Sequence, residues 1–221
     1  MANREQQFLQ FAMSSGVLRF GEFTLKSGRV SPYFFNAGLF YTGAMLSQLA
    51  GFYAAVLCEK EPDDFMLFGP AYKGIVLATA TAAALHDEYG RNVPFAYNRK
   101  EVKDHGEGGA VVGAELAGRV VIIDDVITAG TAIGESMDII ESAGAQTAAV
   151  IVALDREEIV SDQDQSAITQ IRERYGLPVY VIARFSTLIE YLRATPDLKQ
   201  HLHALEAYRN RYGDPAAAAI A

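Results

Sequence analysis

The chain has 221 residues, of which 50% are hydrophobic and 21% are charged, and its formal net charge is -8 at pH 7. This length and composition are typical of a globular domain that buries a sizeable core. The negative charge disfavours a nucleic-acid-binding protein, because no broad basic face is available to neutralise a phosphate backbone, although local cations still permit a small polyanionic substrate.

Three further classes of site or protein are disfavoured. Cys58 is the single cysteine, so an intramolecular disulfide framework is excluded, and its apolar helical surroundings predict a small core residue. No stretch reaches the length of a transmembrane helix and the N-terminus lacks the apolar core of a signal peptide, so we expect a cytoplasmic protein. His201 and His203 lie two apart on an expected helix and point to different faces, which disfavours a metal pair.

The N-terminal part predicts a helix, a hairpin and a second helix. The first helix presents an apolar face formed by Phe8, Leu9 and Ala12. Two short β-like runs between residues 21 and 36 flank Lys26-Ser27-Gly28 and predict a hairpin, here called the hood, within approximately residues 16–40. The second helix carries an apolar stripe formed by Met45, Leu49, Phe52 and Val56.

Strands alternate with helices in the rest of the chain. Apolar runs predict strands at residues 65–68, 94–98, 120–123, 148–154 and 179–182, and helices at about 75–89, 133–140 and 168–175. This alternation predicts an α/β fold, a mostly parallel twisted sheet flanked by helices. We expect one domain over residues 1–221, with a frayed end at 216–221.

The most informative segment runs from residue 120 to residue 132. Four β-branched residues without a polar break predict a strand that is buried on both faces of the sheet. Asp124 and Asp125 follow where this strand ends, and a loop of small residues, Thr128–Thr131, then leads into a helix. Ligands of open α/β sheets bind outside the carboxyl ends of the strands, so we expect the chemistry here.

The residue types of this turn indicate a phosphorylated sugar. Backbone N–H groups at a helix N-terminus bind anions, Gly130 permits close approach of the backbone, and Thr128 and Thr131 add hydroxyl donors. Two carboxylates would repel a phosphate, so Asp124 and Asp125 are expected to accept hydrogen bonds from ribose hydroxyls or to help hold a cation. The alternative, a solvated strand end followed by a helix cap, would explain an acidic pair alone. It leaves unexplained why the Thr128–Thr131 loop follows the strand and the acidic pair in this order.

Two other phosphate motifs are excluded. The glycines of Gly69–Gly74 have P-loop spacing, but Ile75 stands where the P-loop lysine belongs. No G-x-G-x-x-G motif follows a predicted strand, which argues against a Rossmann dinucleotide site.

The segment Val121–Thr131 resembles the phosphoribosyl-diphosphate motif of type I phosphoribosyltransferases. Residues 20–29, 31–36 and 98–108 are similar to the orotate phosphoribosyltransferases, and the similarity extends to about Tyr212. The resemblance implies transfer of the phosphoribosyl group from 5-phosphoribosyl 1-diphosphate to orotate, which gives orotidine 5-phosphate and diphosphate in pyrimidine (UMP) biosynthesis. It also implies Mg²⁺ as cofactor, held mainly by the substrate and near Asp124 and Asp125, and a homodimer without nucleic-acid or membrane partners.

The resemblance further implies the residues of the site. Those that bind phosphoribosyl diphosphate are Lys26, Tyr72, Lys73, Arg99, Lys100, Lys103, His105, Asp124, Asp125, Val126, Ile127, Thr128, Ala129, Gly130, Thr131 and Ala132. Those that bind orotate are Lys26, Phe34, Phe35, Thr128 and Arg156. The catalytic residues are Lys73, Lys103, His105 and Asp125.

A mobile catalytic loop is expected at approximately residues 99–110. Cationic and proton-bearing groups lie there beside several glycines, which permit large backbone excursions, so the segment is suited to close over a bound anion. The resemblance implies that the loop covers the diphosphate and reaches the site of the neighbouring subunit. Taken alone, such a charge run is typical of a solvated surface loop.

Three of the orotate contacts have structural alternatives. Arg156 can grip a carboxylate with two parallel hydrogen bonds, or it can form an ion pair with Asp155, Glu157 or Glu158. Phe34 and Phe35 point to opposite faces of a strand, so at most one meets the base through its side chain, and both are equally compatible with a core position. Lys26 also fits an exposed turn.

Two other functions remain open from the sequence. A regulator that senses phosphoribosyl diphosphate without catalysis would be expected to carry a separate DNA-binding segment, which this sequence does not show. A phosphoribosyltransferase for purines or uracil is disfavoured by Arg156 and by the segment Ser31–Asn36.

Overall fold

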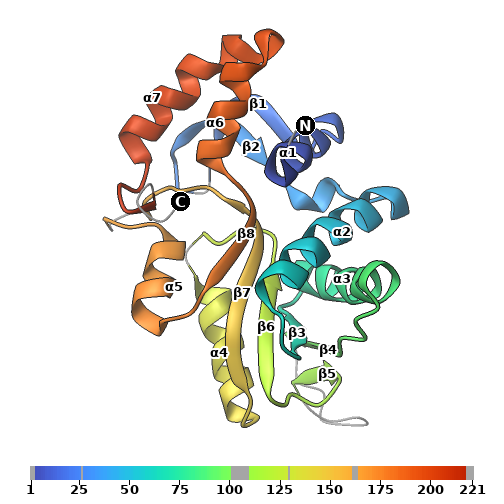
Figure 1. Cartoon of the computed structure of the whole chain (residues 1–221). Coiled ribbons are helices and arrows are strands. Elements are labelled where there is room, and N and C mark those ends of the chain that lie inside the picture. The colour runs from blue at the N-terminus through green and yellow to red at the C-terminus, as the bar shows by residue number, and fades with distance from the viewer. Residues whose placement is uncertain (1–2, 26, 101–109, 129, 161–163, 218–221) are drawn as a thin grey trace.

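In the computed structural model, a six-stranded sheet lies between two layers of helices (Figure 1). The structure describes residues 3–25, 27–100, 110–128, 130–160 and 164–217. The strand order is β5-β4-β3-β6-β7-β8, and the neighbouring strands are parallel except for β4 and β5. The strands are β3 (Met66–Gly69), β4 (Phe95–Asn98), β5 (Val111–Gly113), β6 (Arg119–Asp124), β7 (Gln146–Asp155) and β8 (Val179–Arg184).

Alternate residues of the central strands pack against different helix layers. Val121 and Ile123 of β6 belong to the core shared with α1 (Arg4–Ser14), α2 (Gly43–Lys60) and α3 (Lys73–Tyr89). Val120 and Ile122 belong to the core shared with α4 (Thr131–Ser142) and α5 (Ala167–Tyr175). The predicted strand that is buried on both faces is therefore confirmed, as is the α/β fold.

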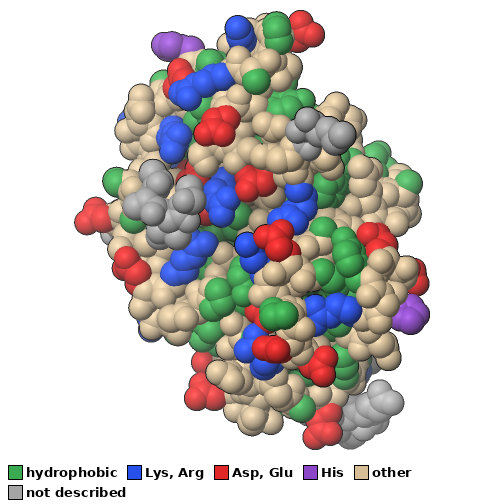
Figure 2. Space-filling model, viewed as in Figure 1, with side chains coloured by type: hydrophobic (Ala, Val, Ile, Leu, Met, Phe, Trp, Pro, Cys, Tyr) green, Lys and Arg blue, Asp and Glu red, His purple; other side chains and the backbone are tan. Residues whose placement is uncertain are grey.

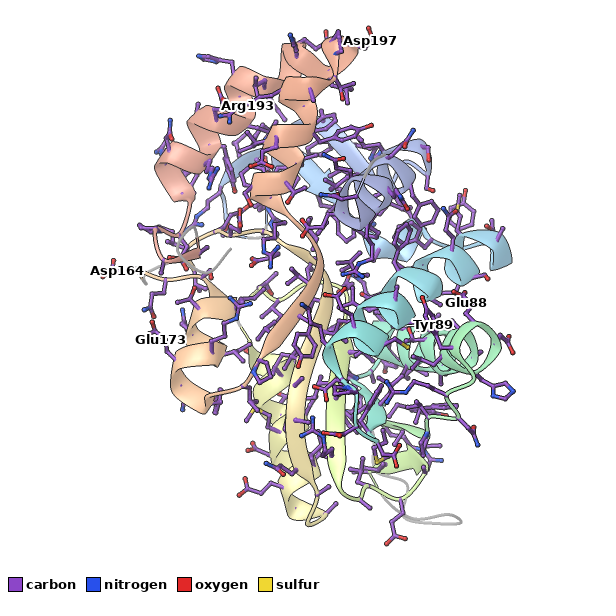
Figure 3. All side chains as sticks on the ribbon, in the orientation of Figure 1. Glu88, Tyr89, Asp164, Glu173, Arg193 and Asp197 are labelled. Carbon is purple, nitrogen blue, oxygen red and sulfur yellow. The ribbon has the colours of Figure 1, made fainter. Side chains whose placement is uncertain are left out.

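The hood and the C-terminal helices lie together beyond the carboxyl ends of the strands (Figure 1). The hood is the antiparallel pair β1 (Leu18–Thr24) and β2 (Val30–Phe35), which confirms the predicted hairpin. Beside it lie α6 (Phe185–Ala194), a 3-10 helix at Pro196–His201 and α7 (Leu202–Tyr212), and another 3-10 turn, Ala37–Leu39, follows β2. Figure 3 shows Arg193 of α6 beside α7, where its guanidinium pairs with Glu206 at 2.6 Å.

Several element boundaries differ from the sequence prediction. Helix α3 begins at Lys73 and not at residue 75, because the N–H of Gly74 already donates to the carbonyl of Pro70 at 3.0 Å. Helix α4 begins at Thr131, two residues earlier than expected. Strand β5 and helix α6 were not predicted.

Three side-chain placements also differ. In α2, Tyr53 and Leu57 are buried with Leu49, whereas Met45 and Phe52 of the expected stripe are only partly buried. Cys58 packs partly buried at the edge of the core. His201 ends the 3-10 helix before α7, and its ring stacks on Phe20 with 4.7 Å between centroids.

The surface is mixed in charge. On the face shown in Figure 2, Lys and Arg side chains are interspersed with Asp and Glu, and that face carries no broad basic area. In the described ranges, no helix combines the length and apolar composition that crossing a membrane requires.

The turn after β3 depends on two glycines. A Cβ atom on Gly69 would lie 2.0 Å from the carbonyl oxygen of Gly74, so the first turn of α3 is packed directly on the end of β3. This contact fixes where α3 starts, and hence where Lys73 lies.

We predict that Gly69→Ala lowers the free energy of unfolding by about 1–3 kcal/mol, because the new methyl group must displace backbone atoms. Gly134→Ala is the matched control: this helical glycine has open space around its Cβ position, so the change should stabilise by about 0.5–1 kcal/mol. Urea unfolding curves measure both values. Equal stability of the two variants would show that the Gly69–Gly74 contact is not tight.

Candidate functional site

The site lies where the order of the parallel strands reverses. Along the chain, β3 is followed by β4 on one side, and then by β6, β7 and β8 on the other side. The loops after β3 and β6 therefore leave the sheet in different directions, and the region between their carboxyl ends, here called the crevice, is the usual ligand position in such sheets.

The acidic pair at the end of β6 is held by its backbone. The carbonyl of Asp124 accepts a hydrogen bond from the Tyr53 hydroxyl at 2.8 Å, and that of Asp125 accepts from the N–H of Ala153 at 2.9 Å. The N–H of Asp125 donates to Oδ1 of Asp124 at 2.8 Å. Helix α2 and strand β7 thus fix the backbone that carries the two carboxylates.

Lys73 places a positive charge on this pair. Its Nζ lies 2.5 Å from Oδ2 of Asp125, whose residue is 5% exposed, whereas the Lys73 side chain is 52% exposed. Burial and the neighbouring charge of Asp125 raise the pKa of Asp124 to about 7. The crevice is therefore a place where a further cation or hydroxyl donor near Asp124 is favoured.

The loop after β3 also contacts the residues that follow β4. The N–H of Ala71 donates to the side-chain oxygen of Asn98 at 2.7 Å, and the Ala71–Tyr72 peptide bond is cis. Tyr72 is 68% exposed, and Lys100 Nζ lies 5.0 Å from the centroid of its ring. The ends of β3 and β4 thus bring Lys100 to Tyr72, the chain neighbour of Lys73, which contacts Asp125.

The loop after β6 ends in an uncapped helix N-terminus. Gly130 is the N-cap of α4 with φ of +74°, a conformation that favours glycine, and no side chain caps the helix. Thr128 and Thr131 are exposed beside it. Such an N-terminus offers free N–H groups and the positive end of the helix dipole to an anion.

Two apolar side chains anchor this loop on the sheet. Val126 packs partly buried against the α2–α3 side of the core, and Ile127 against the α4–α5 side. Their side chains point into the protein, so only their backbone faces a ligand. Ala132 lies in the first turn of α4, where its carbonyl accepts from the Ser136 hydroxyl at 2.6 Å.

The carboxylates fit a magnesium ion that the substrate helps to hold. Within the described ranges, no group of three or more His, Cys, Asp or Glu side chains is arranged to bind a metal. Mg²⁺ is usually bound by one or two carboxylates together with substrate phosphates, and keeps several waters. Asp124 and Asp125 satisfy that smaller requirement.

On the hood, the two phenylalanines have separate environments. Phe35 is buried in the core, with its ring centroid 6.3 Å from that of Phe8. Phe34 is half-buried and stacks on Phe23 at 5.3 Å between centroids. The core position expected as an alternative is therefore true of Phe35, and Phe34 is the ring that remains available.

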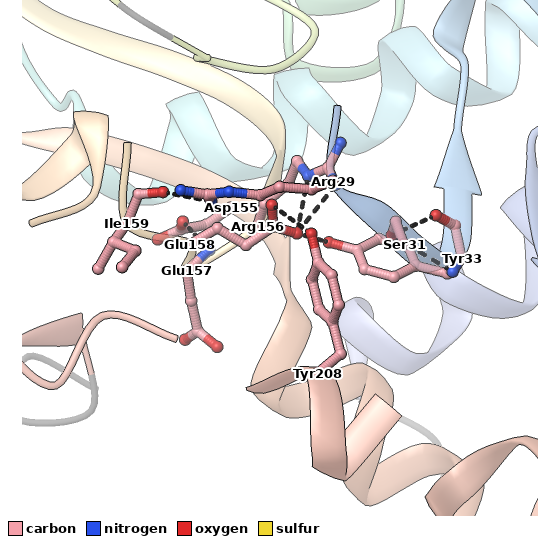
Figure 4. Close-up of polar contacts among 9 residues, drawn as sticks. All are labelled: Arg29, Ser31, Tyr33, Asp155, Arg156, Glu157, Glu158, Ile159 and Tyr208. Atoms are coloured by element: carbon pink, nitrogen blue, oxygen red, sulfur yellow. Dashed lines mark hydrogen bonds and ion pairs between the residues drawn. The ribbon is translucent and has the colours of Figure 1, made fainter. Parts of the chain in front are cut away.

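Arg156 forms the ion pair that the sequence left as an alternative. Its Nε and Nη2 donate to Oε1 of Glu158 at 3.1 and 2.9 Å, and the guanidinium carbon lies 5.1 Å from the ring centroid of Tyr33 (Figure 4). Both side chains are largely buried, at 14% and 12% exposure. Burial alone lowers the pKa of Arg156, but Tyr33 and Glu158 raise it above its ordinary value, so the guanidinium stays charged.

Four of the expected site residues lie outside the described residues, namely Lys26, Lys103, His105 and Ala129. Arg99 follows β4, and its N–H donates to the carbonyl of Ala110 at 2.8 Å.

Sequence reasoning missed two side chains that hold the site, Tyr53 and Asn98, which bind the backbone of the two loops. Glu158, which holds Arg156, was expected only as one of three alternative ion-pair partners. Asn98 carried a usable signal, since it is a polar residue at the carboxyl end of a predicted strand. Tyr53 carried none, because its periodicity indicates only a core position.

Comparisons with known proteins agree with this geometry. Residues 44–174 match the family described as "Phosphoribosyl transferase domain". The orotate phosphoribosyltransferase of Thioalkalivibrio sulfidiphilus is 57% identical over 96% of this chain and 100% of its own length, and that of Chromohalobacter salexigens is 53% identical over 95% and 94%. The crystal structure of the Francisella tularensis orotate phosphoribosyltransferase aligns with a TM-score of 0.86 and 42% identity, over 94% of this chain and 99% of that one.

We predict that Asp124 makes stability depend on pH. Its pKa of about 7 in the folded protein exceeds the ordinary value of 3.8, so the folded state holds a proton that the unfolded state has lost. The free energy of unfolding therefore falls as the pH rises from about 4 to about 7. Asp124→Asn should remove this loss. The difference in the free energy of unfolding between the variant and the parent should therefore grow, in favour of the variant, by about 1–3 kcal/mol from pH 5 to pH 8.

Urea unfolding at the two pH values tests this expectation. The exposed residue Asp64 supplies the control, because Asp64→Asn removes one charge away from the site. A stability difference between Asp124→Asn and the parent that does not change with pH would contradict the prediction.

Proposed function

Because the chain belongs to the family of orotate phosphoribosyltransferases, we propose that it transfers the phosphoribosyl group from 5-phosphoribosyl 1-diphosphate to orotate. The products are orotidine 5-phosphate and diphosphate, a step of pyrimidine (UMP) biosynthesis. The observation that carries this proposal is the contact of Lys73 with Asp125 beside the uncapped N-terminus of α4. It supplies a cation, an acidic pair and an anion site within one crevice.

Each part of the crevice takes one part of the sugar substrate. The 5-phosphate lies at the N-terminus of α4, where the backbone of residues 126–132 and the hydroxyls of Thr128 and Thr131 donate to it. The ribose hydroxyls donate to Asp124 and Asp125. The diphosphate is bound by Lys73 and Lys100, with Tyr72, Lys26, Arg99, Lys103 and His105 completing its site.

The reaction needs charge stabilisation more than proton transfer. A ring nitrogen of orotate attacks C1 of the ribose while the diphosphate leaves from the opposite face, through a transition state with oxocarbenium character. The lysines stabilise the negative charge that builds on the diphosphate, and His105 is suited to protonate it. When bound beside Asp124 and Asp125, Mg²⁺ neutralises diphosphate charge. Orotate is already anionic, so the site requires no strong general base.

The hood side of the crevice selects the base. Arg156 binds the carboxylate of orotate, Phe34 contacts its ring, and Lys26 and Thr128 add polar contacts. We further propose that the whole chain acts as one domain in the cytoplasm, as a homodimer in which the loop at approximately residues 99–110 closes over the diphosphate of the neighbouring subunit.

A direct assay tests the function. Purified protein is mixed with Mg²⁺, phosphoribosyl diphosphate and one base, and loss of base absorbance and release of diphosphate are followed, with orotate, uracil and hypoxanthine in parallel. Turnover with orotate alone is the expected result. Tight binding of phosphoribosyl diphosphate without turnover of any base would move the protein to the class of sensors.

We predict that Lys73→Gln lowers kcat/KM for phosphoribosyl diphosphate by about 100-fold, because it removes a charge that contacts the leaving group. Its melting temperature should also fall, because the change leaves the buried carboxylate of Asp125 without its cation, so the kinetics are measured at a temperature where both variants are folded. The exposed Lys199 on the 3-10 helix provides the control, and Lys199→Gln should leave both values unchanged. Equal kinetics of the two variants would remove Lys73 from the site.

We also predict that Lys103→Ala lowers turnover far more than it lowers stability, because its role is to cover the diphosphate during the reaction. Steady-state kinetics and thermal unfolding of the same preparation measure the two effects. A large loss of melting temperature with intact turnover would contradict the assignment of residues 99–110 as a catalytic loop.

A further inference from the structure

One largely buried carboxylate, that of Glu158, collects donors from three separate parts of the fold. Oε1 of Glu158 accepts from Arg156 and from the hydroxyl of Tyr33 at 2.9 Å, and Oε2 accepts from the hydroxyl of Tyr208 at 3.1 Å (Figure 4). Tyr33 comes from the hood, Arg156 and Glu158 from the turn after β7, and Tyr208 from α7. The carboxylate therefore joins the hood and the C-terminal helix to the sheet.

This arrangement leaves one edge of Arg156 available. Nε and Nη2 both point at Glu158, so the side edge of the guanidinium is occupied. Among the described residues, no hydrogen bond from Nη1 is found. The remaining edge, formed by Nη1 and the second hydrogen of Nη2, has the fork geometry that matches another carboxylate.

Hydrogen bonds from α6 and from the hood also fix the turn after β7. Glu157 has a φ of +51°, unusual for a residue with a side chain, and its N–H donates to Oδ1 of Asp155 at 2.8 Å. Its carboxylate accepts from the N–H and the hydroxyl of Ser186 at 2.7 and 2.9 Å, at the start of α6. Arg29 of the hood donates to the carbonyl of Ile159 at 2.7 Å. Such a turn keeps the side chains of Arg156 and Glu158 in one orientation.

We propose that Glu158, supported by Tyr208, is a positioning residue that aims the free edge of Arg156 at the carboxylate of orotate. This inference rests on the proposed function, in which Arg156 binds that carboxylate. A free arginine side chain loses rotamer freedom when a ligand orders it. Glu158 orders it before orotate arrives, so the site is preorganised.

Arg156 then lies between two carboxylates, and this affects selectivity. The negative charge of Glu158 opposes binding of a second anion unless the guanidinium is held between them. Uracil lacks the carboxylate and gains nothing from this arrangement. The Glu158–Tyr208 pair should therefore govern the discrimination between orotate and uracil, while the phosphoribosyl diphosphate site stays unaffected.

The test compares the KM for orotate with the KM for phosphoribosyl diphosphate. We expect Glu158→Ala to raise the orotate KM by about 10–100-fold and Tyr208→Phe to raise it about 3-fold, with kcat and the KM for phosphoribosyl diphosphate changed less than about 2-fold. Glu158→Gln keeps an acceptor for Arg156 and should recover part of the loss. Tyr212→Phe, the same change on the same helix, is the control and should leave both KM values unchanged. Because Gln and Phe are nearly isosteric replacements, these variants keep the test decisive if Glu158→Ala does not fold.

A double-mutant cycle separates positioning from general support of the fold. If Glu158 acts through Arg156, then Glu158→Gln should not raise the orotate KM further in an Arg156→Ala background. Additive losses, or equal losses for both substrates, would overturn the proposal. Failure of the parent protein to turn over orotate would instead refute the proposed function, whereas an unchanged orotate KM in the Glu158 and Tyr208 variants of an active enzyme would refute only this inference.

Discussion

The parallel pairing of β3 with β6 is the constraint on which the site depends. It brings together two loops whose contacting residues, Lys73 and Asp125, are 52 positions apart in the sequence. The contact of Gly69 with Gly74 sets the start of α3 so that Lys73 faces β6. Any insertion that shifted the register of either strand would move Lys73 away from the carboxylate, because neighbouring residues of a strand point to opposite faces.

The distribution of charge explains how an acidic protein receives a polyanion. The net charge of -8 repels diphosphate at long range, so binding relies on local groups within about one Debye length, ~8 Å at physiological salt. The loops after β3 and β4 carry Lys73 and Lys100, whereas the end of β6 carries both carboxylates. In the proposed complex, the diphosphate and the ribose hydroxyls thus meet opposite sides of the crevice, and the 5-phosphate lies beside the hydroxyls at the N-terminus of α4. Burial and the neighbouring charge of Asp125 raise the pKa of Asp124, and the partly exposed Lys73 only partly opposes this rise.

Much of this arrangement was predictable because its signals are local. The β-branched run, the acidic pair and the Thr128–Thr131 loop together predict a buried strand followed by a loop and a helix N-terminus, and the structure has these elements. Anion binding at that N-terminus stays a prediction. The role of Glu158 was not predictable, because its partners Tyr33 and Tyr208 are 125 and 50 positions away. Strand β5 is only three residues long and is defined by its partner β4 more than by its own pattern.

The hood and C-terminal helices supply what the sheet alone lacks. In the proposed complex, the carboxyl ends of β3, β4 and β6 bind the phosphates and the ribose, which are the same whichever base attacks, so selection of the base requires groups from elsewhere. Those groups meet at Glu158 in a largely desolvated cluster. A buried ion pair contributes little net stability compared with a well-packed apolar cluster, because removing the charges from water costs several kcal/mol per ion by general estimates. The pair of Arg156 and Glu158 is therefore better explained by recognition of a charged base than by stabilisation of the fold.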